Sequence, residues 1–186
     1  MKKIALLALL ALPGCLPAAE GEIALKGVSM PVTMQFEGKT LQLNGMGLRT
    51  KIIFKVYVAG LYLETRSGDG LAIAASEQTK RMELVFLRSV GGGEVADAIS
   101  EGFINNAGLA LPAIRDRVAR FGKMIPDVKK GDRLLFIYRP GSGVEVLANG
   151  APVGSIEGKD FADALFKVWL GEKPADKALK KGLLGL

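Results

Sequence analysis

One arginine and two tyrosines mark the part of the chain best suited to bind a ligand. Arg49 comes just ahead of a run from Ile52 to Leu63 that is almost entirely apolar and contains Tyr57 and Tyr62. A guanidinium beside such a run needs a partner, because burying it unpaired is strongly unfavourable. Its fork of donors binds a carboxylate or an oxyanion through two hydrogen bonds. The sequence therefore predicts an acceptor beside Arg49, which is either a bound ligand or a carboxylate or carbonyl group of the protein itself.

The residue types that the chain lacks exclude many reactions. It has no histidine, and its single cysteine is Cys15. Histidine is the commonest general base and metal ligand, so histidine-dependent nucleophilic systems and most metal sites are excluded. Asp127 and Asp132 lack the further carboxylates that a metal would need. We therefore expect no metal and no cofactor, and any chemistry must come from arginine, lysine, tyrosine, carboxylate or backbone groups.

The first nineteen residues have the pattern of an export signal. Lys2 and Lys3 precede an apolar stretch from Ile4 to Leu12, and small residues follow. A membrane-spanning helix needs ~20 apolar residues, so this stretch is too short to be one. We therefore predict a signal peptide over residues 1–19 and a periplasmic location for the remainder.

Two processing routes fit this segment. Residues 12–15, Leu-Pro-Gly-Cys, resemble a lipobox, whereas residues 17–19, Pro-Ala-Ala, resemble an ordinary signal-peptidase site. Ordinary cleavage removes Cys15 and leaves a mature protein without cysteine, which excludes disulfides and thiolate chemistry. Lipobox processing makes Cys15 the lipid attachment point, and the protein is then anchored to the membrane.

Length and charge narrow the class of protein further. Residues 20–186 are enough for one domain with a substantial core. The chain has 25 lysines and arginines against 19 acidic residues, a net charge of +6. The basic residues are scattered and do not form a dense stripe with aromatic residues between them, so nucleic acid is not the expected partner.

The elements that must position Arg49 follow from apolar periodicity. Alternating residues on both sides of the 37–39 turn predict a hairpin, and Asn149-Gly150 predicts another. We interpret residues 52–63 as a central strand that is covered on both faces. Further strands are predicted at 82–87, 134–139, 144–147 and 153–156, and helices at 95–103, 111–123, 160–170 and shortly after residue 174. This order indicates an α+β domain, a large antiparallel sheet with helices layered on one face.

Six segments in this order resemble the chalcone isomerase-like family, in its bacterial exported branch. They are NGxGLR at 44–49, FKVYVAGLYLE at 54–64, DVKKGD at 127–132, YxPGxG at 138–143, GxIEGxDFAxALxxxWLG at 154–171 and LKKGLLG at 179–185. The resemblance covers roughly residue 23 to the C-terminus, and it implies the fold just described with a ligand cleft between the sheet and the helices.

The resemblance also implies roles for two residues. The arginine matching Arg49 lies in the catalytic cleft of the plant enzyme and holds the fatty-acid carboxylate in the plastid fatty-acid-binding relatives. Tyr57 falls where those relatives carry a tyrosine that shares the carboxylate, and where the catalytic isomerases carry a threonine. The alternative for Tyr57 is a core tyrosine bonded to backbone. An unbroken strand would separate Arg49 from Tyr57 by ~26 Å, so we expect the chain to bend near Thr50 and Lys51, helped by glycines at 45 and 47.

Departures from the catalytic pattern favour binding over catalysis. The isomerases use a tyrosine and an asparagine from the helix after the glycines at 91–93, and a serine or threonine on the late helix. Here the first helix has no tyrosine, Asn105 and Asn106 lie too near its end, and the late position is about Ala162.

Other aromatic and charged residues near the site have simpler interpretations. We interpret Tyr62 and Tyr138 as structural sheet residues and Trp169 as a core residue. Lys55 is either a second anion contact or a lysine at a strand edge whose charge reaches solvent.

The first hypothesis is a periplasmic, non-catalytic protein that binds a fatty acid or a similar amphipathic carboxylate through Arg49 and Tyr57. The alternative is an intramolecular lyase of the chalcone isomerase type, in which Arg49 stabilises oxyanion charge. A third hypothesis is an envelope-associated partner protein whose Arg49 forms only an internal ion pair.

Overall fold

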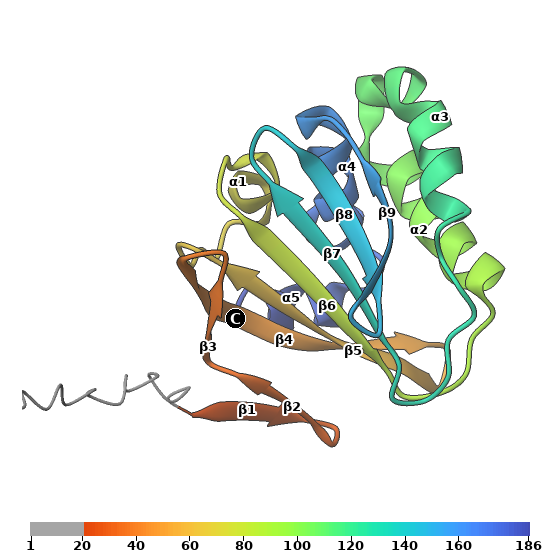
Figure 1. Ribbon diagram of the computed structural model, residues 1–186. Coiled ribbons are helices and arrows are strands. Elements are labelled where there is room, and N and C mark those ends of the chain that lie inside the picture. The colour runs from red at the N-terminus through yellow and green to blue at the C-terminus, as the bar shows by residue number, and fades with distance from the viewer. Residues whose placement is uncertain (1–20) are drawn as a thin grey trace, which may run out of the picture.

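A seven-stranded antiparallel sheet forms the centre of the protein (Figure 1). The computed structural model describes residues 21–186, so the predicted signal peptide and Cys15 lie outside the described residues. The strands follow one another in the sheet in chain order, from β3 to β9. Their bounds are β3 Thr33–Phe36, β4 Lys39–Lys51, β5 Phe54–Leu63, β6 Lys80–Phe86, β7 Arg133–Arg139, β8 Gly143–Ala148 and β9 Ala151–Ile156. Each neighbouring pair is antiparallel, as predicted.

The helices pack on one face of this sheet and build the main core with it. In the orientation of Figure 1, α4 and α5 lie behind the strands and α2 and α3 lie to the right. The helices are α1 Gly70–Ala75, α2 Gly92–Asn106, α3 Leu111–Gly122, α4 Lys159–Leu170 and α5 Lys177–Leu183, with a short 3-10 turn at Gly108–Ala110. Alternate residues of β5 to β8 point into this core, where Phe103, Phe121, Phe161 and Trp169 meet them. The α+β prediction is therefore confirmed.

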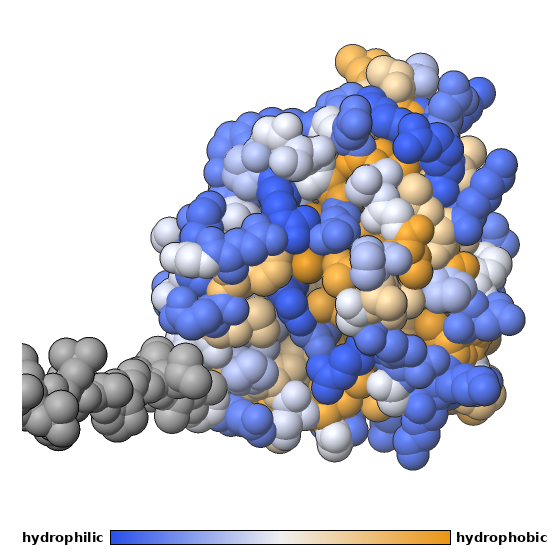
Figure 2. Space-filling model, viewed as in Figure 1, coloured by the Kyte–Doolittle hydropathy of each residue, from blue (hydrophilic) through white to orange (hydrophobic). Residues whose placement is uncertain are grey.

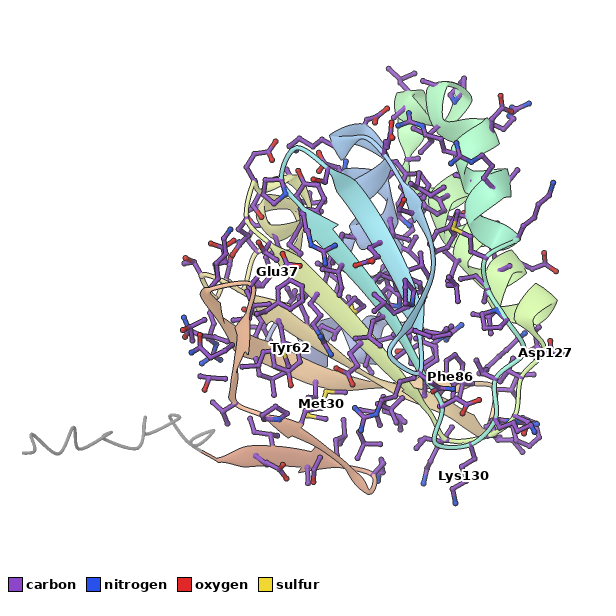
Figure 3. All side chains as sticks on the ribbon, in the orientation of Figure 1. Met30, Glu37, Tyr62, Phe86, Asp127 and Lys130 are labelled. Atoms are coloured by element: carbon purple, nitrogen blue, oxygen red, sulfur yellow. The ribbon has the colours of Figure 1, made fainter. Side chains whose placement is uncertain are left out.

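The opposite face of the sheet is only partly covered. A separate two-stranded hairpin, β1 Glu22–Leu25 and β2 Val28–Pro31, packs over it and buries a second apolar cluster around Met30, Val58 and Tyr62. Figure 3 labels Met30 and Tyr62 on this side. Elsewhere on the visible face, apolar and charged residues are interspersed (Figure 2). The prediction that both faces of β5 are covered is thus correct for residues 57–63, which are all buried.

The start of the predicted central strand is wrong. Residues 52 and 53 form a two-residue turn between β4 and β5, since Lys51 pairs with Phe54. Ile52 and Ile53 are 89% and 78% exposed. The pairing of two long flanking strands sets this turn, although the isoleucines themselves favour extended strands.

Glycines let the last helix lie directly against β4. A side chain on Gly47 would overlap the backbone of Leu179, and one on Gly182 would overlap the backbone of Met46. Asn44, buried at a register shift in β4, donates to the Leu183 carbonyl oxygen at 2.8 Å. The closing helix is therefore fixed over the strand that carries Arg49.

Candidate functional site

Arg49 and Tyr57 lie side by side on neighbouring strands. Arg49 near the end of β4 is the register partner of Tyr57 on β5. The predicted bend at Thr50 and Lys51 is therefore a full chain reversal two residues later, at Ile52 and Ile53, together with a register shift between Arg49 and Thr50. Directly opposed residues in an antiparallel pair have Cβ atoms ~5 Å apart, so the two side chains share one site.

Part of the Arg49 guanidinium is held by the protein. Nη1 donates to the Thr50 carbonyl oxygen at 2.8 Å and lies 3.6 Å from Oδ2 of Asp176. That carboxylate also accepts from the Thr50 amide and caps the first turn of α5. Within residues 21–186, Nε and Nη2 of Arg49 have no hydrogen-bond partner. Arg49 therefore has an internal acceptor and keeps further donors for a ligand.

Tyr57 has a buried hydroxyl group that can donate its proton to a ligand in a hydrogen bond. Trp169 of α4 donates from Nε1 to its oxygen at 3.0 Å, and Phe86 packs edge-on with ring centroids 5.6 Å apart. Burial raises the pKa of Tyr57 to about 12, an effect that the Trp169 hydrogen bond opposes. The phenol therefore stays neutral near pH 7, and no acceptor for its proton lies within the described residues. A neutral donor beside a cation suits a carboxylate.

An apolar cleft lies between these residues and the N-terminal half of α2. Its volume is about 60 Å³, and Phe86, Val95, Ile99 and Trp169 form much of its wall. Lys51 and Glu94 stand at its polar side and form an ion pair at 3.3 Å. The cleft brings together the two predicted site residues and an apolar surface for a short stretch of ligand.

Two grooves adjoin the cleft and share lining residues with it. One, of about 250 Å³, continues along Val56 and Val90 to Phe54. The other, of about 360 Å³, crosses the outer surface of α2 and is lined largely by charged and polar residues, including Asp97, Glu101 and Asn105. An apolar chain longer than the cleft therefore fits the first groove better than the second.

Two residues of the site were not predicted as such. Asp176 could have been recognised as a helix cap, because it precedes a short helix after Pro174, but not as a partner of Arg49. Trp169 is core, as predicted, yet it is also the hydrogen-bond partner of Tyr57. Both come from elements distant in sequence, so no local pattern links them to the 49–57 hairpin.

The remaining candidates have structural surroundings. Tyr62 donates to the Pro31 carbonyl oxygen and Tyr138 to Glu77, in agreement with their predicted roles. Lys55 is exposed on β5 and does not line the cleft. Asp127 accepts from the Gly92 amide at the start of α2.

The described part of the chain has neither a metal-binding cluster nor a membrane-spanning helix. Residues 21–186 contain no group of three or more cysteine and carboxylate side chains placed to hold a metal ion. Within the same residues, no helix has the length and hydropathy of a membrane span.

The curled antiparallel sheet, its single helix layer and the cleft between them define a chalcone isomerase-like fold. The family model described as chalcone isomerase-like matches residues 22–185, so the chain belongs to the chalcone isomerase-like family. The resemblance noted in the sequence is thereby confirmed.

A solved structure of this fold is similar over nearly the whole domain. It is the crystal structure of a fatty-acid binding protein from Arabidopsis thaliana, with a TM-score of 0.74 and 16% identity. The match covers 88% of this chain and 96% of that one. At this identity the likeness establishes a shared fold. A search of curated proteins found no match.

Proposed function

We propose that this protein is a non-catalytic binder of a fatty acid or a similar amphipathic carboxylate. The observation that carries the proposal is the pairing of Arg49 and Tyr57 across β4 and β5, with unused donors at the edge of an apolar cleft. The carboxylate accepts from Arg49 and from the neutral Tyr57 hydroxyl. The fold shared with a plant fatty-acid binding protein supports the same ligand class.

The cleft is small for a long alkyl chain. Pockets for drug-sized ligands are typically ~300 Å³ or more, against about 60 Å³ here. The carboxylate and the first carbons occupy the cleft, and the rest of the tail follows the groove past Val56 and Val90. Each buried methylene contributes ~0.8 kcal/mol, so the tail supplies much of the affinity.

The cleft offers little for isomerase chemistry. Its titratable groups among the described residues are Arg49, Lys51, Tyr57 and Glu94, and the last is exposed and paired with Lys51. A tyrosine with a pKa near 12 is a poor base at neutral pH. These features favour binding over an Arg49-assisted cyclisation, and incubation with a hydroxychalcone should give no turnover above the uncatalysed rate.

The proposal also covers where the protein functions and how residues 1–19 are processed. We expect export through residues 1–19 and function in the periplasm. The intact mass of protein recovered from the envelope distinguishes cleavage after Ala19 from lipid attachment at Cys15.

Fluorescence of the single tryptophan tests the ligand class directly. Trp169 borders the cleft and bonds Tyr57, so titration with palmitate should change its emission in a saturable way. Arg49→Ala should weaken this binding about 10- to 100-fold, as expected for loss of hydrogen bonds to a charged group. Native mass spectrometry with lipid extraction of the same proteins identifies any ligand that is retained during purification.

Arg120→Ala is the matched control, because Arg120 is an exposed arginine of α3 that does not line the cleft. It should bind palmitate as the wild type does. Equal affinity of wild type and Arg49→Ala, or no binding of fatty acids of any length by the folded wild type, would overturn the proposal.

A further inference from the structure

Three neighbouring large apolar side chains are exposed where β4 turns into β5. We define the hairpin tip as residues 52–54, Ile-Ile-Phe, of which Ile52 is 89%, Ile53 78% and Phe54 52% exposed. No residue of the tip belongs to either apolar core cluster of the described chain. The hydrophobic effect opposes leaving three such neighbours in water.

The tip also holds a β-branched residue at a positive φ, which no other turn of residues 21–186 does. Three turns use a residue followed by glycine, Lys26-Gly27, Glu37-Gly38 and Asn149-Gly150, with positive φ at both positions. At the tip, Ile52 has a φ of 59°. A β-branched residue is strongly disfavoured there. Backbone strain of this kind is concentrated at functional sites.

Basic side chains surround the tip. Lys51 and Lys55 flank it in sequence, and the Arg88 guanidinium lies 4.6 Å from the centre of the Phe54 ring. The bridge between Val90 and Val128 brings the 129–130 lysine pair to the same end of the molecule, where Figure 3 labels Lys130. Lys51 is paired with Glu94, whereas Lys55, Arg88 and the lysine pair have no ion-pair partner within residues 21–186.

We propose that the hairpin tip inserts into the interface of an anionic lipid bilayer, with the surrounding lysines and arginine on the headgroups. Peripheral proteins are held on membranes by burial of apolar side chains and by attraction of basic residues to anionic lipids. The hairpin tip and the basic residues around it offer both. A stable protein partner needs ~800 Å² from each side. The three residues of the hairpin tip present far less area than that, so they suit a lipid surface better than a protein partner.

The placement of the tip links this surface to the cleft. Ile52 and Phe54 line the groove that continues past Val56 and Val90 to the Arg49 site. Membrane docking would therefore set the open end of the groove against the acyl region of the bilayer. Docking itself does not depend on the proposed ligand, since it is measured with vesicles and without added fatty acid.

Vesicle co-sedimentation tests the proposal. The probe is vesicles of phosphatidylglycerol and phosphatidylethanolamine, with pure phosphatidylcholine vesicles for comparison. We expect sedimentation with the anionic vesicles that weakens as salt is raised. Replacing the tip, Ile52→Ser, Ile53→Ser and Phe54→Ser together, should weaken it at least tenfold. Lys55→Glu combined with Arg88→Glu should weaken it to a similar extent, with the apolar tip intact.

The control replaces exposed apolar residues elsewhere. Ile104 and Leu109 are 65% and 102% exposed near the far end of α2, ~22 Å along the helix from its start. Ile104→Ser with Leu109→Ser should bind vesicles as the wild type does. Unchanged near-ultraviolet circular dichroism establishes that each variant is folded.

Absence of binding by the folded wild type, or equal binding by the wild type and the tip variant, would overturn the proposal. A folded wild type that binds palmitate but not anionic vesicles would overturn the membrane proposal and leave the fatty-acid proposal standing. If Arg49→Ala loses palmitate binding but keeps vesicle binding, the membrane proposal stands independently of the fatty-acid site.

Discussion

The hydroxyl of Tyr57 connects core packing to the proposed ligand binding at the residue scale. It accepts from Trp169 and is buried beside Phe86, so its orientation is fixed before any ligand arrives. A preorganised donor spares the ligand the entropy of ordering that side chain. The tyrosine thus acts both as a core residue and as the proposed partner of Arg49, and the two roles can be separated by mutation.

Tyr57→Phe should weaken palmitate binding about three- to tenfold, because it removes one hydrogen bond to the carboxylate. It should also lower the free energy of unfolding by about 1–3 kcal/mol, since the Trp169 indole loses its acceptor in a buried place. Binding is measured by calorimetry and stability by urea denaturation. A variant that loses stability but keeps full affinity would show that Tyr57 is only a core residue.

A second buried polar residue, Lys80, gives the protein a specific pH dependence. It is fully buried, and its ammonium donates to the carbonyl oxygens of Ile73, Ala74 and Ser76 at the end of α1. Burial lowers the pKa of Lys80 to about 8, with nearby Lys159 also lowering it and the carboxylates of Asp163 and Glu77 opposing the shift.

The lowered pKa predicts stability that rises above pH 8. The folded protein releases the Lys80 proton near pH 8, whereas the unfolded chain keeps it until about pH 10.5, the ordinary value. Between these values the unfolded state binds more protons, so the free energy of unfolding rises with pH. Between pH 8 and pH 10 the Lys80 contribution should be about 2 kcal/mol. Ionisation of tyrosines in the unfolded chain, whose ordinary pKa is 10, subtracts from the total rise in the wild type and in the lysine variants alike.

Urea denaturation at pH 7, 8, 9 and 10 measures this contribution. Lys80→Met should lose the rise between pH 8 and pH 10, and Lys123→Met, at an exposed lysine after α3, should keep it. The same slope in all three proteins would show that another group causes the pH dependence.

At the scale of elements, the docking of α5 on β4 controls the Arg49 site. The helix brings Asp176 to Arg49, and its close approach requires glycine at positions 45, 47 and 182. A side chain at any of these positions meets backbone atoms of the other element, which have little freedom to move away. The glycines of β4 therefore position Arg49, the proposed ligand-binding residue, indirectly, because they let the cap residue Asp176 reach it.

Gly47→Ala should destabilise the fold by about 2 kcal/mol or more through overpacking and should weaken palmitate binding as Asp176 moves. Gly93→Ala is the matched control. Gly93 lies in the first turn of α2, and an added Cβ meets no atom within 4 Å, so alanine should be neutral or stabilise by about 0.5–1 kcal/mol. Thermal unfolding of both variants checks the pair, and wild-type stability of Gly47→Ala would contradict the close-packing argument.

The same element contacts show which parts of the fold the sequence can predict. Glu37-Gly38 and Asn149-Gly150 mark their hairpins because glycine accepts the positive φ at the second position of each turn, and Asn149 accepts it at the first position of its turn. Nothing marks the turn at Ile52 and Ile53, where two strong strand formers are held by the pairing of β4 with β5. That pairing is long-range information, so a local pattern extended β5 backwards by two residues.

The candidate site, too, can be predicted only in part from the sequence. Arg49 and Tyr57 were identifiable from their residue types and family pattern, because both sit on one hairpin. Asp176 and Trp169 reach the site through α5 and α4, whose positions depend on contacts between distant backbones. The cleft volume depends on how Phe86, Val95 and Ile99 pack together, which composition and periodicity do not specify.

At the scale of the whole molecule, the features proposed to bind fatty acid and membrane lie at one end. The open side of the cleft, the groove, the strained hairpin tip and the basic residues around it all lie where β4 and β5 meet. Three other hairpin turns place a lysine, a glutamate or an asparagine at positive φ before a glycine, and none of them holds a β-branched residue there. This difference supports the proposal that the tip serves membrane binding at a cost in stability.

Ile52→Gly should therefore raise the stability of the whole protein while weakening its association with membranes. Glycine removes the strain of a positive φ, which is worth about 1–2 kcal/mol, and part of this gain is offset by the greater freedom of glycine in the unfolded chain. We expect a net increase in unfolding free energy of about 0.5–1 kcal/mol in urea, with weaker sedimentation on phosphatidylglycerol vesicles. Gly150→Ala, at a φ of 84° and with no atom near the added Cβ, should have the opposite effect on stability and leave vesicle binding unchanged. If Ile52→Gly is less stable than the wild type, Ile52 stabilises the fold, and its positive φ is then no evidence for a function.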